Sequence, residues 1–108
     1  MPWIKAGEVW WCRLGENIGT EINGKNAFYL RPVYILKKVN RYSAVVIPLT
    51  SKEKYGSWFC DFYLGEKHEF ANLSQIRAIS LFRLENKIGT VGKETKELIK
   101  RRLMKFLL

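Results

Sequence analysis

Cysteine, histidine and long apolar stretches are all scarce in this sequence of 108 residues. Its two cysteines, Cys12 and Cys60, lie in separate strand-like segments, which favours buried free thiols of a cytosolic protein over a disulfide. Neither cysteine forms a CxxC pair and His68 is the only histidine, so the spacing of a metal site is missing and we expect no metal or other cofactor. No stretch approaches the ~18 consecutive apolar residues of a membrane-spanning helix, and the first residues lack the apolar run of a secretory signal. These absences predict a cytoplasmic protein with no membrane segment.

Acidic residues are also few, with 10 Asp and Glu against 19 Lys and Arg, which leaves a formal net charge of +9. The excess is spread over both halves of the chain, so it belongs to the whole molecule and not to a tail. A field of this sign favours polyanionic partners such as nucleic acid, an acidic protein segment or anionic lipid, although it also serves solubility alone. The length fits one domain over residues 1–108 and is too short for a TIM barrel or a complete dinucleotide-binding enzyme.

Short strand-like runs separated by polar loops make up most of the sequence. Branched, aromatic and leucine residues fill these runs, whereas glycine, asparagine and lysine fill the loops between them. The predicted strands are residues 7–14, 29–39, 43–49, 58–64 and 68–70. Ser80 predicts a capped helical turn over Leu81 to Glu85, while residues 73–79 are ambiguous. Several aromatic residues inside these runs are expected in the core, namely Trp10, Trp11, Trp58 and Phe59.

A helix is predicted from about Lys93 to Leu108. Its apolar residues recur every three to four positions and so share one face: Leu98, Ile99, Leu103, Phe106 and Leu107. A basic amphipathic helix of this kind can lie on a membrane, but we expect it to cover the open mouth of a small barrel. The predicted fold class is therefore mainly β with a C-terminal helix, in an SH3-like small barrel.

Two polar residues at strand ends form a candidate site. If residues 29–39 and 43–49 make a hairpin that turns at Asn40 and Arg41, then Arg31 and Thr50 are each nine residues from the turn. Both would then lie at the same open end of the hairpin and face one concave surface. A loop with several glycines at residues 15–25 would fold over that surface.

Several short motifs occur in an order that resembles a known protein family. They are Gly7-Glu8-Val9-Trp10, the loop with Gly19 and Glu21, Arg31-Pro32-Val33, Pro48-Leu49-Thr50-Ser51, Ser74-Gln75-Ile76-Arg77 and Lys87-Ile88-Gly89. In this order the chain resembles the MazF/PemK toxins of bacterial type II toxin–antitoxin systems, from about residue 6 to the C-terminal helix. The resemblance implies an SH3-like barrel, a homodimer and metal-independent cleavage of single-stranded RNA. It also implies that Arg31 and Thr50 are the catalytic pair.

The resemblance implies a mechanism in which the ribose 2′-hydroxyl attacks the neighbouring phosphate. The permanently charged, planar guanidinium of Arg31 suits a phosphate whose charge grows in the transition state. Thr50 would bind the same phosphate, with Ser51 as a helper. Glu21 is a candidate for the base that removes the 2′ proton, since a pair of histidines does not exist in this chain.

Two loops supply the expected contacts to RNA. Bases of single-stranded RNA stack on aromatic side chains, for which Phe28, Tyr29 and Tyr55 are candidates. Polar and flexible residues of the same loops are candidates for supporting or binding RNA: Gly19, Asn23, Lys25, Lys52 and Lys54. The segment Lys25 to Leu30 is longer than the shortest family loops, so the base preference of relatives does not transfer.

The family resemblance also implies a protein partner, an antitoxin whose acidic, flexible tail would lie in the RNA groove. Two other functions stay open at this point. The chain could be a basic SH3-like module that binds nucleic acid without cutting it, because a fold does not fix a function. It could also poison gyrase, as the related CcdB toxins do.

Overall fold

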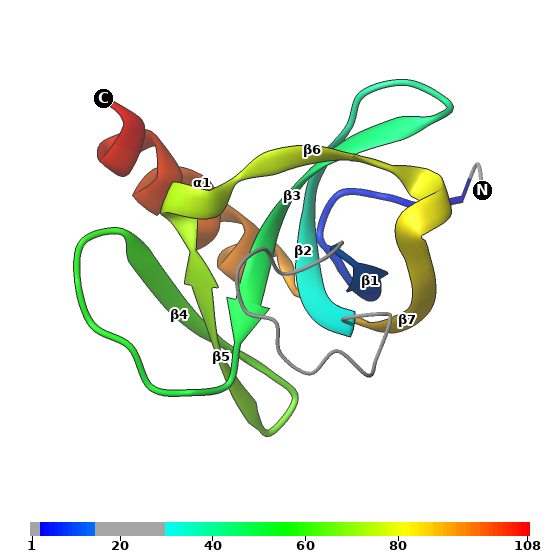
Figure 1. The fold of residues 1–108 in the computed structure, drawn as a ribbon. Helices are drawn as coiled ribbons and strands as arrows, with labels where there is room; N and C mark the ends of the chain where they lie inside the picture. Colours follow the sequence, from blue (N-terminus) through cyan, green and yellow to red (C-terminus); the bar gives the residue numbers. More distant parts are fainter. Residues whose placement is uncertain (1–2, 15–29) are drawn as a thin grey trace, which may run out of the picture.

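The computed structural model describes residues 3–14 and 30–108, and its ribbon is shown in Figure 1. The elements in chain order are β1 (Glu8–Arg13), β2 (Leu30–Lys38), β3 (Ser43–Thr50), β4 (Phe59–Leu64), β5 (Lys67–Asn72), the 3-10 turn η1 (Leu73–Gln75), β6 (Arg77–Ser80), the 3-10 turn η2 (Leu81–Arg83), β7 (Leu84–Thr90) and α1 (Lys93–Leu107). The five predicted strands are confirmed to within three residues at each end. Ser80 caps η2 as predicted, because its hydroxyl accepts a hydrogen bond from the backbone N–H of Phe82 at 3.2 Å. The predicted turn is shorter than expected, since β7 already begins at Leu84.

The strands form one strongly bent antiparallel sheet. Its order is β4-β5-β3-β2-β1-β7, and β6 pairs with the first half of β3. Within the described residues no ladder joins β4 to β7, so the barrel is open at that seam. The mainly β fold with a C-terminal helix is therefore confirmed.

The central strands β2 and β3 are buried on both faces, and each face belongs to a separate core. Tyr34 and Ile47 pack on one side with residues of β4, β5 and α1. Val33 and Val46 pack on the other side with residues of β1, β6, η2 and β7.

Helix α1 packs against the sheet, as predicted. Ile99 and Leu103 are buried in the first core, and Arg102 donates a hydrogen bond to the backbone carbonyl of Phe59 at 2.7 Å. The expectation that Phe106 and Leu107 are also buried is wrong, because both are exposed where the last turn extends past the sheet (Figure 1). None of the helices in the described residues is long and apolar enough to cross a membrane.

Local hydrogen bonds explain how the hairpin of β2 and β3 turns. The side-chain Oδ1 of Asn40 accepts hydrogen bonds from the backbone N–H groups of Tyr42 and Ser43 at 2.8 and 2.9 Å, and from the Ser43 hydroxyl at 3.0 Å. Asparagine favours such turns because its short side chain satisfies the backbone two residues onward. Next to this turn Lys38 pairs with Ala44, and a register shift between Ile35 and Lys37 then brings Val33 opposite Pro48 at the end that presents the candidate site.

The aromatic residues expected in the core divide between the interior and the surface. Trp10 is buried, as predicted, and its indole N–H donates to Glu8 Oε1 at 2.9 Å. The same expectation is wrong for Trp11 and Trp58, whose exposed fractions are 38% and 45%. Trp11 alternates with buried neighbours and therefore points outward, and Trp58 precedes β4 instead of belonging to it.

Candidate active site

The β2–β3 ladder brings the two predicted catalytic residues to the same end of the sheet. Val33 pairs with Pro48 and Tyr34 with Ile47, so the same register, continued by two residues, places Arg31 opposite Thr50. Side chains two residues apart share a face of a strand. Arg31 and Thr50 therefore lie on the face of Val33 and Pro48, where β2 begins and β3 ends.

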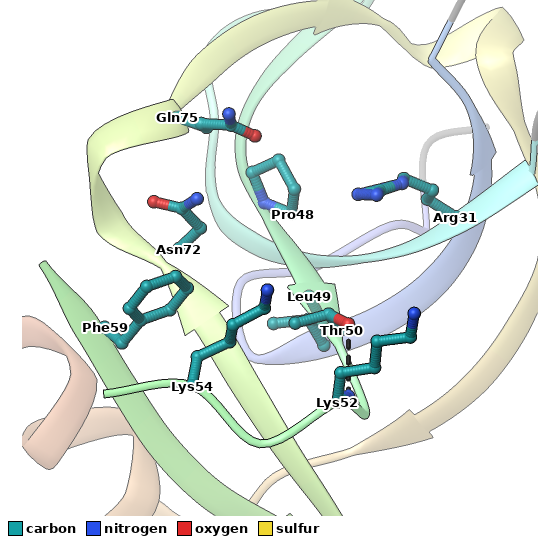
Figure 2. Close-up of a pocket in the computed structure, with 9 residues that line it drawn as sticks. All are labelled: Arg31, Pro48, Leu49, Thr50, Lys52, Lys54, Phe59, Asn72 and Gln75. Atoms are coloured by element: carbon teal, nitrogen blue, oxygen red, sulfur yellow. Dashed lines mark hydrogen bonds between the residues drawn. The ribbon is translucent and has the colours of Figure 1, made fainter. Parts of the chain in front are cut away.

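A pocket of about 340 Å³ occupies this place and is shown in Figure 2. Its lining residues are Arg31, Pro48, Leu49, Thr50, Lys52, Lys54, Phe59, Asn72 and Gln75. Three of these residues are cationic and none is acidic, so the lining attracts anions. The structure thus brings Arg31 and Thr50 together with two of the predicted loop lysines.

The hydroxyl of Thr50 is oriented by the loop that follows β3. Its Oγ1 accepts a hydrogen bond from the backbone N–H of Lys52 at 3.2 Å (Figure 2). A hydroxyl is both a donor and an acceptor, so its proton stays available for an oxygen atom in the pocket. Ser51 is exposed and does not line the pocket, so its predicted helper role finds no support in this arrangement.

Arg31 enters the pocket from the start of β2. Its side chain is half-buried, and within the described residues it makes no hydrogen bond or ion pair. Figure 2 shows the guanidinium pointing toward Pro48 from the side opposite Phe59. A guanidinium with all its donors free is suited to bidentate contact with a phosphate.

Neither cysteine nor the histidine of the chain lines the pocket. Cys12 is the cross-strand partner of Arg31, but it is fully buried, and burial raises the pKa of its thiol to about 11 in spite of nearby arginines. Both cysteines are buried free thiols, as predicted. His68 is not a lining residue; its Nε2 lies 2.8 Å from Asp61 Oδ2 on the β4–β5 hairpin. The described residues contain no group of three or more His, Cys, Asp or Glu that could hold a metal ion.

Five lining residues were not predicted as site residues: Pro48, Leu49, Phe59, Asn72 and Gln75. Pro48 and Leu49 belong to the same sequence motif as Thr50. Phe59 was expected in the core but forms a wall of the pocket, and Asn72 is its cross-strand partner. Gln75 follows at the end of η1. The sequence signal was present for Gln75, which belongs to the motif Ser74-Gln75-Ile76-Arg77, but Asn72 depends on strand pairing that the sequence does not display.

Most of the residues predicted in the first loop lie outside the described residues. They are Gly19, Glu21, Asn23, Lys25, Phe28 and Tyr29. Tyr55 is described and exposed, and its hydroxyl donates a hydrogen bond to Glu53.

The comparison with known proteins agrees with this fold. A family profile described as "PemK-like, MazF-like toxin of type II toxin-antitoxin system" matches residues 5–107. The chain belongs to this family. No sequence among curated proteins matches the chain significantly.

Solved structures of MazF-like toxins share the fold at low sequence identity. One is an endoribonuclease in complex with its cognate antitoxin from a mycobacterial species, with a TM-score of 0.73, 18% identity, and coverage of 96% of this chain and 94% of that chain. Another is the Mycobacterium tuberculosis toxin MazF-mt6, with a TM-score of 0.68, 12% identity, and coverage of 91% and 93%. This MazF-like chain therefore has the fold of these toxins over nearly its whole length.

Proposed function

We propose that this MazF-like toxin is a metal-independent endoribonuclease that cleaves single-stranded RNA, with Arg31 and Thr50 as its catalytic residues. The observation that carries the proposal is that a guanidinium and an oriented hydroxyl share one pocket whose charged lining residues are all cationic. The guanidinium has no hydrogen-bond or ion-pair partner among the residues that the structure describes. The net charge of +9 gives the surrounding field the sign that attracts RNA.

The reaction that suits these residues is attack of the ribose 2′-oxygen on the adjacent phosphorus. The new bond joins the 2′-oxygen to phosphorus while the bond to the 5′-oxygen breaks, which yields a 2′,3′-cyclic phosphate and a 5′-hydroxyl. The internal nucleophile avoids the entropy of fixing a water molecule. The 2′ proton must leave, and the 5′-oxygen must gain a proton.

Each residue has a defined part in this step. Arg31 would hold the scissile phosphate and neutralise the charge that grows on its oxygens. Thr50, whose acceptor side is engaged by Lys52, would donate its proton to one of those oxygens. Lys52 and Lys54 would hold flanking phosphates of the strand.

The protein partners follow from the family. We propose a homodimer, and an antitoxin with an acidic tail that competes with RNA for the pocket. One structural relative is an endoribonuclease with its cognate antitoxin, which supports the second partner. A tail rich in carboxylates would match a lining with three cations and no acid.

The decisive experiment is cleavage of a long RNA in the presence of EDTA. We expect a set of defined cuts with cyclic-phosphate and 5′-hydroxyl ends, and a loss of about 10²–10³-fold in rate for Arg31→Ala, the usual cost of removing one electrostatic donor. Thr50→Val keeps the β-branched shape and should lower the rate in the same direction. Gel filtration and circular dichroism should show both variants folded.

Three results would contradict the proposal. Near-wild-type cleavage by Arg31→Ala would remove the assigned role of that residue. RNA that is bound but never cut would favour a binding module without catalysis. An inhibited topoisomerase with intact RNA would favour a gyrase poison.

A further inference from the structure

The side-chain amide of Asn72 is held in one orientation. Asn72 ends β5 and caps η1, and its Oδ1 accepts hydrogen bonds from the backbone N–H of Ser74 at 3.1 Å and from the Ser74 hydroxyl at 2.6 Å. A backbone N–H cannot accept a hydrogen bond, so turning the amide over would set donor against donor. Asn72 therefore presents only the Nδ2 amino group elsewhere, and Figure 2 shows this nitrogen on the side of Pro48.

The strand register places this amino group one step from the catalytic pair. Asn72 pairs with Phe59 across the β4–β5 ladder, and Thr50 pairs with Phe70, two residues before Asn72. Such diagonal neighbours in an antiparallel sheet lie about 7–8 Å apart. A group bound to Arg31 and Thr50 thus has the Asn72 amide and the Phe59 ring as its next contacts along the pocket.

The remaining polar side chains in this part of the pocket are mainly hydrogen-bond donors. The charged side chains around it are Arg31, Lys52 and Lys54, which are donors only. Gln75 carries both a donor and an acceptor, and its amide has no hydrogen-bond partner among the residues that the structure describes. The aromatic wall of Phe59 offers a stacking surface for a base.

From this geometry we infer that the pocket selects a nucleobase with a keto oxygen, uracil or guanine, at the edge that meets the Nδ2 amino group of Asn72. This inference rests on the proposed function and adds the class of base that the site accepts. Uracil carries a carbonyl oxygen where cytosine carries an amino group, and guanine carries one where adenine carries an amino group. An amino group at that position would face another donor, and both would be left unpaired in the pocket.

The test compares bases that differ in this group and in the adjacent ring nitrogen, which is a donor beside a keto oxygen and an acceptor beside an amino group. An oligoribonucleotide that wild-type protein cuts is varied one position at a time, with uridine exchanged for cytidine and adenosine for inosine, which has the 6-keto oxygen of guanine. We expect one position at which the keto base is cleaved about tenfold faster, the size of one well-placed base contact. The same ratio should appear in binding to oligonucleotides whose 2′-hydroxyl at the cut is replaced by hydrogen, since this separates recognition from chemistry.

The variant Asn72→Asp reverses the hydrogen-bonding character of the residue. Its carboxylate still accepts from Ser74, so the cap of η1 is kept, but it now presents an acceptor to the pocket. We expect the preference at that position to shift toward the amino base by at least tenfold relative to wild type. Gln75→Glu is the matched control, because it adds the same charge to the same pocket and should slow all substrates without reversing the preference.

The outcomes separate this inference from the function on which it rests. Wild-type protein that cuts RNA without favouring a keto base at any position overturns the inference and leaves the nuclease intact. An unchanged preference in Asn72→Asp, or a reversal in Gln75→Glu of the same size, also overturns it. Wild-type protein that cuts no RNA overturns the proposed function first.

Discussion

At the scale of single residues, the fold shifts the pKa values of two buried carboxyl groups, Glu8 and Glu69, in opposite directions. Glu8 Oε1 accepts hydrogen bonds from the backbone N–H of Lys5 and the indole of Trp10, and Oε2 lies 3.2 Å from Lys87 Nζ. Burial alone raises the pKa of Glu8, but these contacts outweigh it and hold the pKa below its ordinary value. Glu69 is equally buried, yet its Oε1 has no hydrogen-bond partner in the described residues. Glu8 therefore links the N-terminal segment to β7 and is stabilised in its charged form. Burial destabilises the charged form of Glu69.

Glu69→Gln should stabilise the protein at neutral pH. Burial raises the pKa of Glu69, while the positive charges of Lys67 and His68 lower it without cancelling the rise. As the pH climbs past the ordinary carboxyl pKa near 4.5, the unfolded chain loses its proton before the folded chain does, so the free energy of unfolding falls. Glutamine lacks this titration and matches the protonated form, so the two proteins should be equally stable near pH 4. The free energy of unfolding of the variant should exceed that of the wild type by an amount that grows toward pH 7, to about 1 kcal/mol or more.

Urea unfolding at a series of pH values measures this difference. A stability difference that stays constant between pH 4 and pH 7 would show that Glu69 ionises in the fold as it does in the unfolded chain.

Residue spacing predicted that Arg31 and Thr50 lie at the same end of the sheet, but it did not predict Asn72 beside them. Arg31 and Thr50 are each nine residues from the predicted turn at Asn40 and Arg41, and this symmetry is readable in the sequence. The observed strands reach the same pairing through a register shift between Ile35 and Lys37, which the sequence does not display. The role of Asn72 depends on a cross-strand pairing and on the side chain of Ser74, which occupies its oxygen. Neither relation has a signature in the sequence, so Asn72 could not be predicted as a site residue.

At the scale of elements, the strands with buried faces were predictable and the exposed edge strand was not. β2 and β3 carry continuous apolar runs because both faces are covered. β7 has one buried residue, Leu84, and pairs with β1 through two register shifts, so its sequence shows no alternation. The predicted C-terminal helix begins at Lys93 as expected, but its last turn extends past the sheet and leaves Leu107 exposed.

In the loop between β3 and β4, Gly56 is needed both for its positive φ and because a side chain there would collide with Trp58. Gly56 has a φ of 132°, and a Cβ atom there would lie 2.7 Å from the Trp58 ring. Gly65, in the β4–β5 turn, has a φ of 65° and open space where its Cβ would be. Gly56→Ala should therefore cost about 3 kcal/mol and displace Lys52 and Lys54, whereas Gly65→Ala should cost about 1 kcal/mol from backbone strain alone.

Urea unfolding and RNA binding distinguish the two glycine variants. Gly56→Ala should lose both stability and affinity for a non-cleavable oligonucleotide, while Gly65→Ala should keep its affinity. Equal losses of stability in both variants would mean that the collision with Trp58 contributes nothing beyond the cost of a positive φ.

At the scale of the whole molecule, charge and motif order together carried the functional prediction. The excess of 19 Lys and Arg over 10 Asp and Glu predicted a polyanionic partner, and the order of short motifs predicted the toxin family. The sheet explains why that order matters. Segments around Arg31, Thr50 and Gln75 are far apart in the chain, yet all three line one pocket. The class of base that we propose for this pocket depends on hydrogen-bond directions, which only the folded chain defines.

The distribution of this charge predicts how binding depends on salt. Each phosphate that a cation neutralises releases counterions, so the logarithm of affinity falls against the logarithm of salt concentration with a slope of about −0.7 per phosphate on a single strand. If Lys52 and Lys54 each hold one phosphate, the double substitution Lys52→Ala/Lys54→Ala should make the slope shallower by about 1.4. Lys93→Ala/Lys100→Ala removes the same charge from exposed positions on α1, outside the pocket, and should leave the slope near that of wild type. Fluorescence anisotropy with a non-cleavable oligonucleotide between about 50 and 200 mM salt covers the useful range. Equal changes in the two double variants would show that the net charge of the molecule, and not the cations of this pocket, holds the RNA.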